Sequence, residues 1–422
     1  MSKQKRWRHA PRTQAPQRAS ASQIPTSATE FDVLVERIVP GGMGLAHADG
    51  RTIFVALSAA GDHVRVRAEK TRGKVVFASI IEVLAPSTVR VAPPCPYFGR
   101  CGGCDFQQLN YDAQLEAKIS IVQDCLRRIA GIETPVEVTI KASPNAWHYR
   151  SRAQWQHDRA HKTLGYFERA SHRVCDVVEC PVIVPALQES LASLREAMRG
   201  DALPEHVAEF QAVAGDGGMV SIVPPVNESE IEREAARTIG GLRYRFDAEG
   251  FFQINHEQLP ALIDAALSDC GGETAVDLYC GVGLFTLPLA KRFKRVIGVE
   301  ASDAAINYAR LNLEAAQLTN AQAKCARVGD WLKHNAAALA PIDFVLLDPP
   351  RAGVEDRDAL DGILALRPKR IAYVSCDPAT LARDLRAFIG GGYTLDSVAA
   401  FDMFPQTHHV ETIAHLSSTR ER

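Results

Sequence analysis

The sequence has no run of eighteen consecutive apolar residues, the length at which a helix can begin to cross a membrane. Its N-terminal stretch is basic and lacks the apolar core of a secretory signal. We therefore expect a protein of the cytoplasm with no membrane partner. In that reducing compartment, the ten cysteines favour metal binding or catalysis over disulfide bonds.

The net charge is also small, because 48 basic and 50 acidic residues leave a charge of −2. The charge is unevenly placed, since six lysines and arginines precede Glu30, the first acidic residue. This stretch is rich in Pro, Gln and Ser, and we predict that residues 1–30 form a disordered basic tail. Such a tail can bind nucleic acid by neutralising phosphates, or it can simply aid solubility.

A chain of 422 residues is too long for one ordinary core, and its 46% hydrophobic content is that of a globular protein. Between residues 31 and 86, short apolar runs alternate with turn signals such as Pro40-Gly41-Gly42 and Asp49-Gly50. Turns about every ten residues predict a small β-barrel. Barrels of this size often bind oligonucleotides, although any small all-β module has the same pattern.

The middle of the chain, residues 87–246, has mixed helical and strand signals and is predicted to be an α+β domain. One helix is clear, because apolar residues recur at steps of four and three. Cys125 borders this stripe and is interpreted as a core residue. The stripe consists of Leu115, Ile119, Val122, Leu126 and Ile129.

The C-terminal part, residues 247–422, alternates apolar strand candidates with helical segments. This rhythm predicts a doubly wound, Rossmann-like α/β domain with a parallel sheet, whose ligands bind beyond the carboxyl ends of the strands. The strand candidates are Thr274–Leu278, Arg295–Val299, Phe344–Leu347 and Arg370–Val374.

A glycine pair, Gly281 and Gly283, closes the first of these strands and opens a helix, where free N–H groups can meet a ligand. Glu300 ends the next strand, where a carboxylate can accept both hydroxyls of a ribose. A dinucleotide site needs a third glycine, but Thr286 stands there. Its absence favours S-adenosylmethionine over NAD; the alternative is a glycine turn without a ligand.

Two further strand ends carry reactive groups. Asp348-Pro349-Pro350-Arg351 follows one strand, and Cys376 follows the next, directly before a helix that should begin near Pro378. A helix N-terminus can lower the pKa of a cysteine below its usual value of about 8.5. Thiolate addition to C6 of uracil would let C5 attack an electrophilic methyl group. The alternative for Cys376 is a buried core residue.

Such a reaction also needs a base that removes the C5 proton. Glu411 lies in a segment whose apolar flanks suggest a buried strand, and burial would raise the pKa of its carboxyl group toward neutral. His408 and His409 compete for this role, although we interpret them as a surface pair without a catalytic function.

Taken together, the motifs from Phe31 to Leu416 resemble those of the RNA uridine-C5 methyltransferase family. The resemblance implies that the C-terminal domain is a class I methyltransferase domain that uses S-adenosylmethionine. Five motifs in the same order carry it: Phe252-Gln253-Ile254-Asn255, Asp277–Gly283, Asp348–Arg351, Ser375–Pro378 and His409–Thr412.

The resemblance also implies roles for single residues. Cys376 is the nucleophile and Glu411 is the base. Leu284 departs from the asparagine of some relatives, so a hydrogen bond to the cofactor is missing there. The residues that contact S-adenosylmethionine are Gln253, Tyr279, Glu300 and Asp348, and Asp330 approaches its adenine.

Residues 31–86 resemble a TRAM domain, a small OB-like barrel that binds RNA. The family's transfer-RNA branch generally lacks this module and the cysteine cluster described next. The resemblance therefore points to 23S ribosomal RNA as the partner, and no obligate protein partner is evident.

Three cysteines, Cys95, Cys101 and Cys104, stand close together, one short of a complete ligand set. By resemblance, Cys180 is the fourth ligand of a [4Fe–4S] cluster, and Cys175 is its main competitor. Spacing alone would suit zinc nearly as well. The nearby segment 149–152, with Trp155 and Tyr166, is predicted either to hold flipped-out RNA or to pack in the core.

Three other functions stay open. An RNA cytosine-C5 methyltransferase typically has a second cysteine in the Asp-Pro-Pro motif, which this sequence lacks. An exocyclic-amine methyltransferase would have an aromatic residue in place of Arg351. A non-catalytic ribosome-assembly factor that binds RNA would leave Cys376 and Glu411 unexplained.

Overall fold

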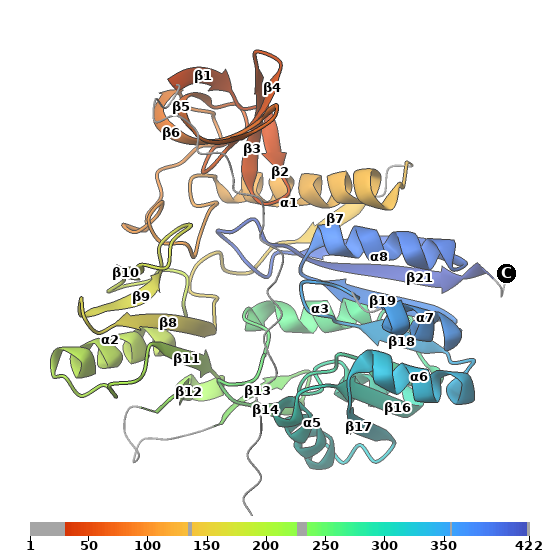
Figure 1. Ribbon diagram of the computed structural model, residues 1–422. Coiled ribbons are helices and arrows are strands. Elements are labelled where there is room, and N and C mark those ends of the chain that lie inside the picture. Colours follow the sequence, from red (N-terminus) through yellow and green to blue (C-terminus); the bar gives the residue numbers. More distant parts are fainter. Residues whose placement is uncertain (1–29, 134–136, 226–233, 355–356, 420–422) are drawn as a thin grey trace, which may run out of the picture.

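The computed structural model describes residues 30–133, 137–225, 234–354 and 357–419. These residues form an N-terminal β-barrel, a central antiparallel sheet and a large C-terminal sheet covered by helices (Figure 1). The predicted basic tail lies outside the described residues, apart from Glu30. No helix in the described ranges is long and apolar enough to cross a membrane.

The N-terminal barrel confirms the predicted all-β module. Its strand β5 shows why the sequence folds this way: Val64 and Val66 are buried, while Arg65 and Arg67 point outward and pair with acidic residues of β1. The sheet order is β1-β5-β6-β4-β3-β2. The strands are β1 (Glu30–Leu34), β2 (Arg37–Val39), β3 (Met43–Ala48), β4 (Arg51–Val55), β5 (His63–Arg72) and β6 (Val75–Ala85).

The central domain contains a five-stranded antiparallel sheet in the order β10-β9-β8-β11-β12. Helix α2 (Pro185–Arg199) covers this sheet, and its leucines pack in one core with Trp155 and Phe210. The predicted α+β class is confirmed. The strands are β8 (Arg152–Asp158), β9 (Thr163–Phe167), β10 (Val174–Asp176), β11 (Glu209–Ala214) and β12 (Val220–Val223).

The C-terminal sheet contains all four predicted strands at nearly the predicted positions. Its order is β17-β16-β15-β18-β19-β21-β20-β7, in which β7 spans Val138–Lys141. Strand β21 runs antiparallel to both of its neighbours, so the sheet is mixed rather than wholly parallel. The strands are β15 (Gly272–Leu278), β16 (Phe293–Glu300), β17 (Ala321–Cys325), β18 (Phe344–Leu347), β19 (Arg370–Ser375), β20 (Tyr393–Phe401) and β21 (Glu411–Ser418).

Helices cover both faces of this sheet, as a doubly wound fold requires. Successive residues of one strand belong to opposite cores: Val345 packs on one face and Leu346 on the other. One face is covered by α3 (Leu259–Ala266), α4 (Thr286–Ala290) and α5 (Asp303–Ala315), and the other by α6 (Val328–Leu339), α7 (Arg357–Ala365) and α8 (Pro378–Gly390).

Two segments placed in the central domain by sequence pack against the C-terminal sheet instead. Strand β7 (Val138–Lys141) pairs in parallel with β20. The hairpin of β13 (Ala235–Ile239) and β14 (Leu242–Phe246) buries its apolar residues in the same core as α3, α4 and α5. A linear boundary at residue 246 therefore does not separate the two cores, since apolar surface from both sides of it completes one of them.

Helix α1 (Tyr111–Cys125) forms where predicted, but its buried face differs from the predicted stripe. Ile129 at the end of the stripe is exposed, whereas Gln114 and Lys118 are buried. These two polar side chains are buried because each has a partner. Lys118 forms an ion pair with Asp402, and Gln114 exchanges hydrogen bonds with Gln406. α1 is thus fastened to the loop that precedes β21. Cys125 is buried, as predicted.

Candidate active site and cysteine cavity

The turn after β15 places the predicted cofactor residues. Tyr279, Gly281 and Gly283 all have positive φ angles, and a Cβ on Gly283 would lie 2.8 Å from a Leu287 methyl carbon, so this turn requires glycine. The Gly281 N–H donates to the Glu300 carboxylate at 3.2 Å, which holds that side chain beside the turn. Glu300 and Tyr279 therefore lie together at the carboxyl ends of the strands.

Thr286 stands where a dinucleotide site would have its third glycine. Its hydroxyl donates to Asp277 Oδ2 at 2.5 Å, and both residues are buried. Burial raises the pKa of Asp277 to about 8; the Thr286 hydrogen bond opposes this shift, and the charges of Asp348 and Glu300 contribute to it. The second oxygen, Asp277 Oδ1, has no hydrogen-bond partner among the described residues.

Gln253 and Asp348 come together from distant parts of the sequence. Gln253 is buried in the loop before α3, and its amide lowers the pKa of Asp348 by hydrogen bonding to the carboxylate. Burial has the larger and opposite effect, raising the pKa of Asp348 to about 7. Three carboxyl groups thus gather beside the turn, and this donor set fits the sulfonium, ammonium and ribose groups of S-adenosylmethionine.

Two cofactor predictions fare differently. Asp330 lies exposed in the first turn of α6, beyond the end of β17, and its contact with adenine stays a prediction. Leu284 is buried in the core beside α3, α4 and α5, and its backbone carbonyl accepts a hydrogen bond from the Tyr244 hydroxyl at 3.2 Å. A leucine side chain there offers a cofactor no hydrogen bond.

Cys376 and Glu411 meet at adjacent strand ends. Ser375 of β19 pairs with Thr412 of β21, and the Thr412 hydroxyl donates to the Ser375 carbonyl at 2.9 Å. The next residues outward are Cys376 on one strand and Glu411 on the other. The antiparallel strand β21, which sequence did not orient, is what brings these two residues together.

A pocket of about 120 Å³ opens beside Cys376. Arg351 from the Asp-Pro-Pro-Arg motif lines it, as do His408 and His409. The turn Pro40-Gly41 between β2 and β3 also contributes, so the barrel reaches the candidate active site. Sequence analysis gave no role to Arg351 or to this turn; the cation directly after Asp-Pro-Pro was the available signal for Arg351.

The prediction that the pKa of Cys376 is lowered by the helix N-terminus is wrong. Burial, together with the charges of Glu411 and Asp348, raises the pKa of the thiol to about 12, although Arg351 opposes the shift. Helix α8 does begin at Pro378, but the Asp377 carboxylate accepts its first free N–H groups at 2.9 Å. The helix N-terminus is therefore already neutralised by its own cap.

Glu411 follows its prediction. It is only 2% exposed, and burial raises the pKa of its carboxyl group well above the ordinary value. Asp348 adds to this shift, and Arg351 opposes it. A carboxyl group whose pKa is raised holds a proton more readily, which suits a base that takes a proton from carbon.

The two histidines are not the surface pair that we predicted. His408 Nδ1 lies 2.5 Å from an Asp105 carboxylate oxygen, and its ring packs against that of His409 with 4.1 Å between the centroids and an angle of 41° between the ring planes. Burial lowers the pKa of His409 to about 3, so its ring is neutral and can accept a hydrogen bond from Arg351 at 3.4 Å. The pair lines the pocket together with residues of α1 and of the barrel turn Pro40-Gly41.

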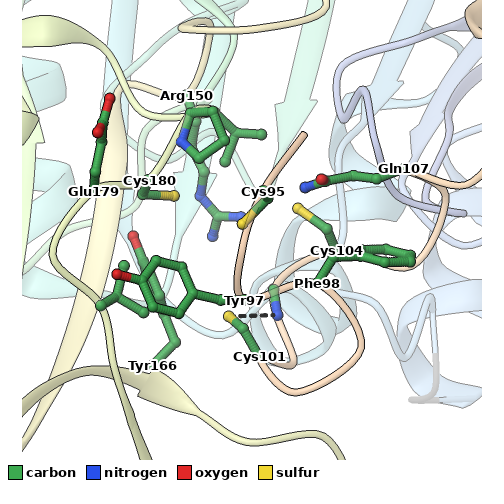
Figure 2. Close-up of a pocket in the computed structure, with 14 residues that line it drawn as sticks. Cys95, Tyr97, Phe98, Cys101, Cys104, Gln107, Arg150, Tyr166, Glu179 and Cys180 are labelled. Atoms are coloured by element: carbon green, nitrogen blue, oxygen red, sulfur yellow. Dashed lines mark hydrogen bonds between the residues drawn. The ribbon is translucent and has the colours of Figure 1, made fainter. Parts of the chain in front are cut away.

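Four cysteines surround a cavity of about 60 Å³ in the central domain (Figure 2). Cys95, Cys101, Cys104 and Cys180 line it, and the Gly103 N–H donates to the Cys101 sulfur at 3.4 Å. No three side chains of His, Cys, Asp or Glu in the described ranges converge as closely as the ligands of a single metal ion.

Cys175, the competitor of Cys180, is excluded from the lining of the cavity. It is buried in the central core, and its sulfur accepts a hydrogen bond from Arg100 Nε at 3.2 Å. The predicted alternative for segment 149–152 is also settled in favour of packing. Tyr149 and Trp155 are fully buried, and Arg152 donates to the backbone carbonyls of Ala248 and Gly250.

Two known protein families have models that match this chain. The model of the tRNA (uracil-5-)-methyltransferase family matches residues 233–419, and that of the TRAM domain matches residues 27–81. An uncharacterized RNA methyltransferase of Thermosynechococcus vestitus is 33% identical over 92% of this chain and 98% of its own length. The 23S rRNA (uracil(1939)-C(5))-methyltransferase RlmD of Alkalilimnicola ehrlichii is 33% identical over 91% and 96%.

A solved structure is similar over the same span. The tRNA (uracil-54, C5)-methyltransferase of Pyrococcus abyssi, in complex with S-adenosyl-L-homocysteine, matches with a TM-score of 0.72 and 26% identity. The match covers 92% of this chain and 100% of that one. The arrangement of barrel, central domain and C-terminal sheet is therefore shared with a protein that binds the product form of the methyl donor.

Proposed function

This chain belongs to the RNA uracil-C5 methyltransferase family, and from that membership we propose that it methylates a uridine of 23S ribosomal RNA in the cytoplasm. It is an S-adenosylmethionine-dependent enzyme that acts on C5 of uracil in RNA. The 23S substrate is supported by relatives whose names specify it, such as those of Alkalilimnicola ehrlichii and Vibrio parahaemolyticus. Transfer RNA is the second candidate, because the Pyrococcus abyssi enzyme acts on it with the same overall architecture.

The observation that carries the chemistry is that Cys376 and Glu411 lie at neighbouring strand ends, where both feel the charge of Asp348. When bound, S-adenosylmethionine supplies the methyl group as an electrophile. Cys376 Sγ forms a bond to C6 of uracil after its proton passes to solvent, and electron density moves to C5. Arg351 favours the thiolate, because its positive charge lowers the pKa of the thiol.

Glu411 completes the turnover. C5, once it carries that electron density, would take the methyl group that bound S-adenosylmethionine supplies, and the demethylated cofactor would leave. Glu411 then takes the C5 proton, and the bond between Cys376 Sγ and C6 breaks, which restores the aromatic ring and the free enzyme. Two groups whose pKa values are both raised by burial are thus used in sequence, one as nucleophile and one as base.

A groove between the barrel and α1 supports an RNA substrate. It measures about 420 Å³ and shares Pro40 and Cys125 with the pocket beside Cys376, so the two spaces adjoin. Arg128 and Phe54 lie along it, and a cation with an aromatic ring suits the phosphate and base of a single strand. A uridine flipped out of such a strand would enter the pocket.

The substrate can be tested by tritium release. We expect release of tritium from unmodified 23S rRNA labelled with [5-³H]uridine, in step with methyl incorporation, because every C5 methylation expels the C5 hydrogen. Transfer RNA labelled in the same way should release none. Release from transfer RNA alone would overturn the 23S assignment. Methyl incorporation without tritium release, or release only from [5-³H]cytidine, would overturn the uridine-C5 chemistry.

The cysteine cavity is included in the proposal as the site of a [4Fe–4S] cluster. Four thiols are the donor set of such a cluster, and an N–H group aimed at the sulfur of Cys101 suits a ligand that carries negative charge. Arg150 reaches among the thiols and would balance part of that charge (Figure 2). Zinc remains the competing metal, since four thiolates also suit it.

Replacement of Cys180 should remove the metal, and replacement of Cys175 should not. Cys180→Ala takes one of four sulfurs from the cavity, whereas Cys175→Ala removes a core thiol that points to Arg100. Iron and acid-labile sulfide per chain, measured after anaerobic purification, should fall several-fold in the first variant and stay at the wild-type level in the second. The reverse pattern would make Cys175 the ligand, and zinc in place of iron would replace the cluster.

A further inference from the structure

His408 lies where three parts of the molecule meet at the wall of the catalytic pocket. Asp105, which directly follows Cys104, accepts two hydrogen bonds from it: one from the His408 backbone N–H at 2.8 Å, and one at 2.5 Å from Nδ1. Phe106 packs against the imidazole edge to face, with 6.4 Å between ring centroids. The cysteine loop therefore holds both the backbone and the ring of this residue.

The cysteine loop (residues 95–106) contacts the loop before β21 (residues 402–410, here called the catalytic loop) at a second point. The backbone N–H groups of Asp105 and Phe106 both donate to the Gln406 carbonyl, at 3.1 and 3.0 Å. Gln406 has a positive φ angle and is almost fully buried, so its carbonyl has little freedom to find other donors. Four hydrogen bonds in total connect residues 105–106 with residues 406–408.

The barrel closes the other side of His408. Gly42, in the turn between β2 and β3, has a φ angle of +74°, and a Cβ built on it would lie 2.7 Å from His408 Cβ. Only glycine fits this contact without displacing the histidine. The approach also explains how Pro40 and Gly41 of the same turn come to line the pocket.

His408 also contacts a residue that lines the pocket. Its ring packs against that of His409 at an interplanar angle of 41°, and His409 in turn accepts a hydrogen bond from Arg351 at 3.4 Å. Arg351 lies beside the Cys376 thiol, with which it lines the pocket. A displacement of His408 would therefore be passed through His409 to the cation that favours the thiolate.

We propose that Asp105 is a positioning residue that couples the cysteine loop to the catalytic pocket through His408. It acts by fixing His408, and through it His409 and Arg351, and not by touching the substrate. The proposal gives the cysteine loop a part in methyl transfer: it is the fixed support against which the catalytic loop is held. It rests on the proposed uridine methylation, because its effect is measured on that reaction.

The test compares three carboxylate variants by steady-state kinetics. Asp105→Ala removes both acceptors and should lower kcat about 100-fold, as a small misplacement of catalytic groups can, with the KM for S-adenosylmethionine unchanged. Asp105→Asn keeps an acceptor for the backbone N–H and should retain most of the rate. Asp158→Ala is the matched control, because Asp158 binds the ring and backbone of His161 in the same way on the exposed surface.

A second variant approaches from the barrel side. Gly42→Ala should lower kcat without touching the cysteine loop, since its methyl group displaces His408. Metal content and melting temperature are measured for every variant. The proposal is overturned if Asp105→Ala keeps the wild-type kcat, if it loses its metal in proportion to its activity, or if Asp158→Ala is equally impaired. Failure of the wild-type protein to methylate RNA would instead refute the proposed function.

Discussion

Cys376→Ala is expected to form no covalent complex with RNA that contains 5-fluorouracil, and to lose methylation activity on the order of 10⁴-fold or more, as removal of a catalytic nucleophile does. The wild-type enzyme, given the same RNA and S-adenosylmethionine, should form a complex that survives denaturation. Fluorine at C5 cannot leave as a proton does, so the bond between Cys376 Sγ and C6 persists after methyl transfer.

The pocket supplies its own control. Cys125 lines the same space as Cys376, but it is a buried residue at the end of α1. Cys125→Ala should therefore still form the complex, which is detected as a band of reduced mobility in a denaturing gel. A complex that survives in Cys376→Ala and disappears in Cys125→Ala would show that Cys125, and not Cys376, is the nucleophile.

The raised pKa of the Cys376 thiol has a consequence for this experiment. Because the thiol is protonated near neutral pH, adduct formation should accelerate as pH rises toward the thiol pKa of about 12. Arg351→Met removes the cation that opposes this shift and should slow adduct formation at every pH below that value. A rate that is independent of pH would mean that proton loss from Cys376 does not limit the reaction.

The fold was largely predictable because its signals are local. Alternating apolar residues identify the strands of the barrel, and four apolar runs such as Phe344–Leu347 identify the parallel strands of the C-terminal sheet. The predicted boundary at residue 246 does not separate the two cores, because strand β7 and the β13–β14 hairpin are short segments that pack against residues far away in the sequence. Periodicity reports that a segment has an apolar face, but not which core receives it.

In the candidate site, too, local features could be predicted from the sequence and long-range features could not. Motifs identified Cys376, Glu411 and the carboxylates near the cofactor turn, since each follows a recognisable strand. The ionisation of Cys376 was mispredicted because its pKa depends on burial and on the charges of Glu411 and Asp348, which only the tertiary structure brings together. The link between Asp105 and His408 spans most of the chain and has no local signature at all.

Glu411→Gln is expected to separate the two halves of the reaction. Glutamine keeps the size of the side chain but cannot take the C5 proton, so turnover should fall about 10²- to 10⁴-fold, as loss of a general base does. Addition of Cys376 and methyl transfer do not need that step. A methylated covalent complex should therefore accumulate on ordinary uridine RNA, where the wild-type enzyme shows almost none.

The pH dependence gives an independent check on the same residue. A carboxyl group with a raised pKa stays protonated to higher pH, and a protonated Glu411 cannot accept the C5 proton. Release of methylated RNA in the wild type should thus rise as pH rises through that raised pKa, and Glu411→Gln should lose this dependence. His409→Gln is the control for the base alone: loss of its contact with Arg351 should slow adduct formation, but no methylated complex should accumulate, because a ring whose pKa is lowered to about 3 competes poorly for the proton. Accumulation of the complex in His409→Gln, with normal release in Glu411→Gln, would make His409 the base.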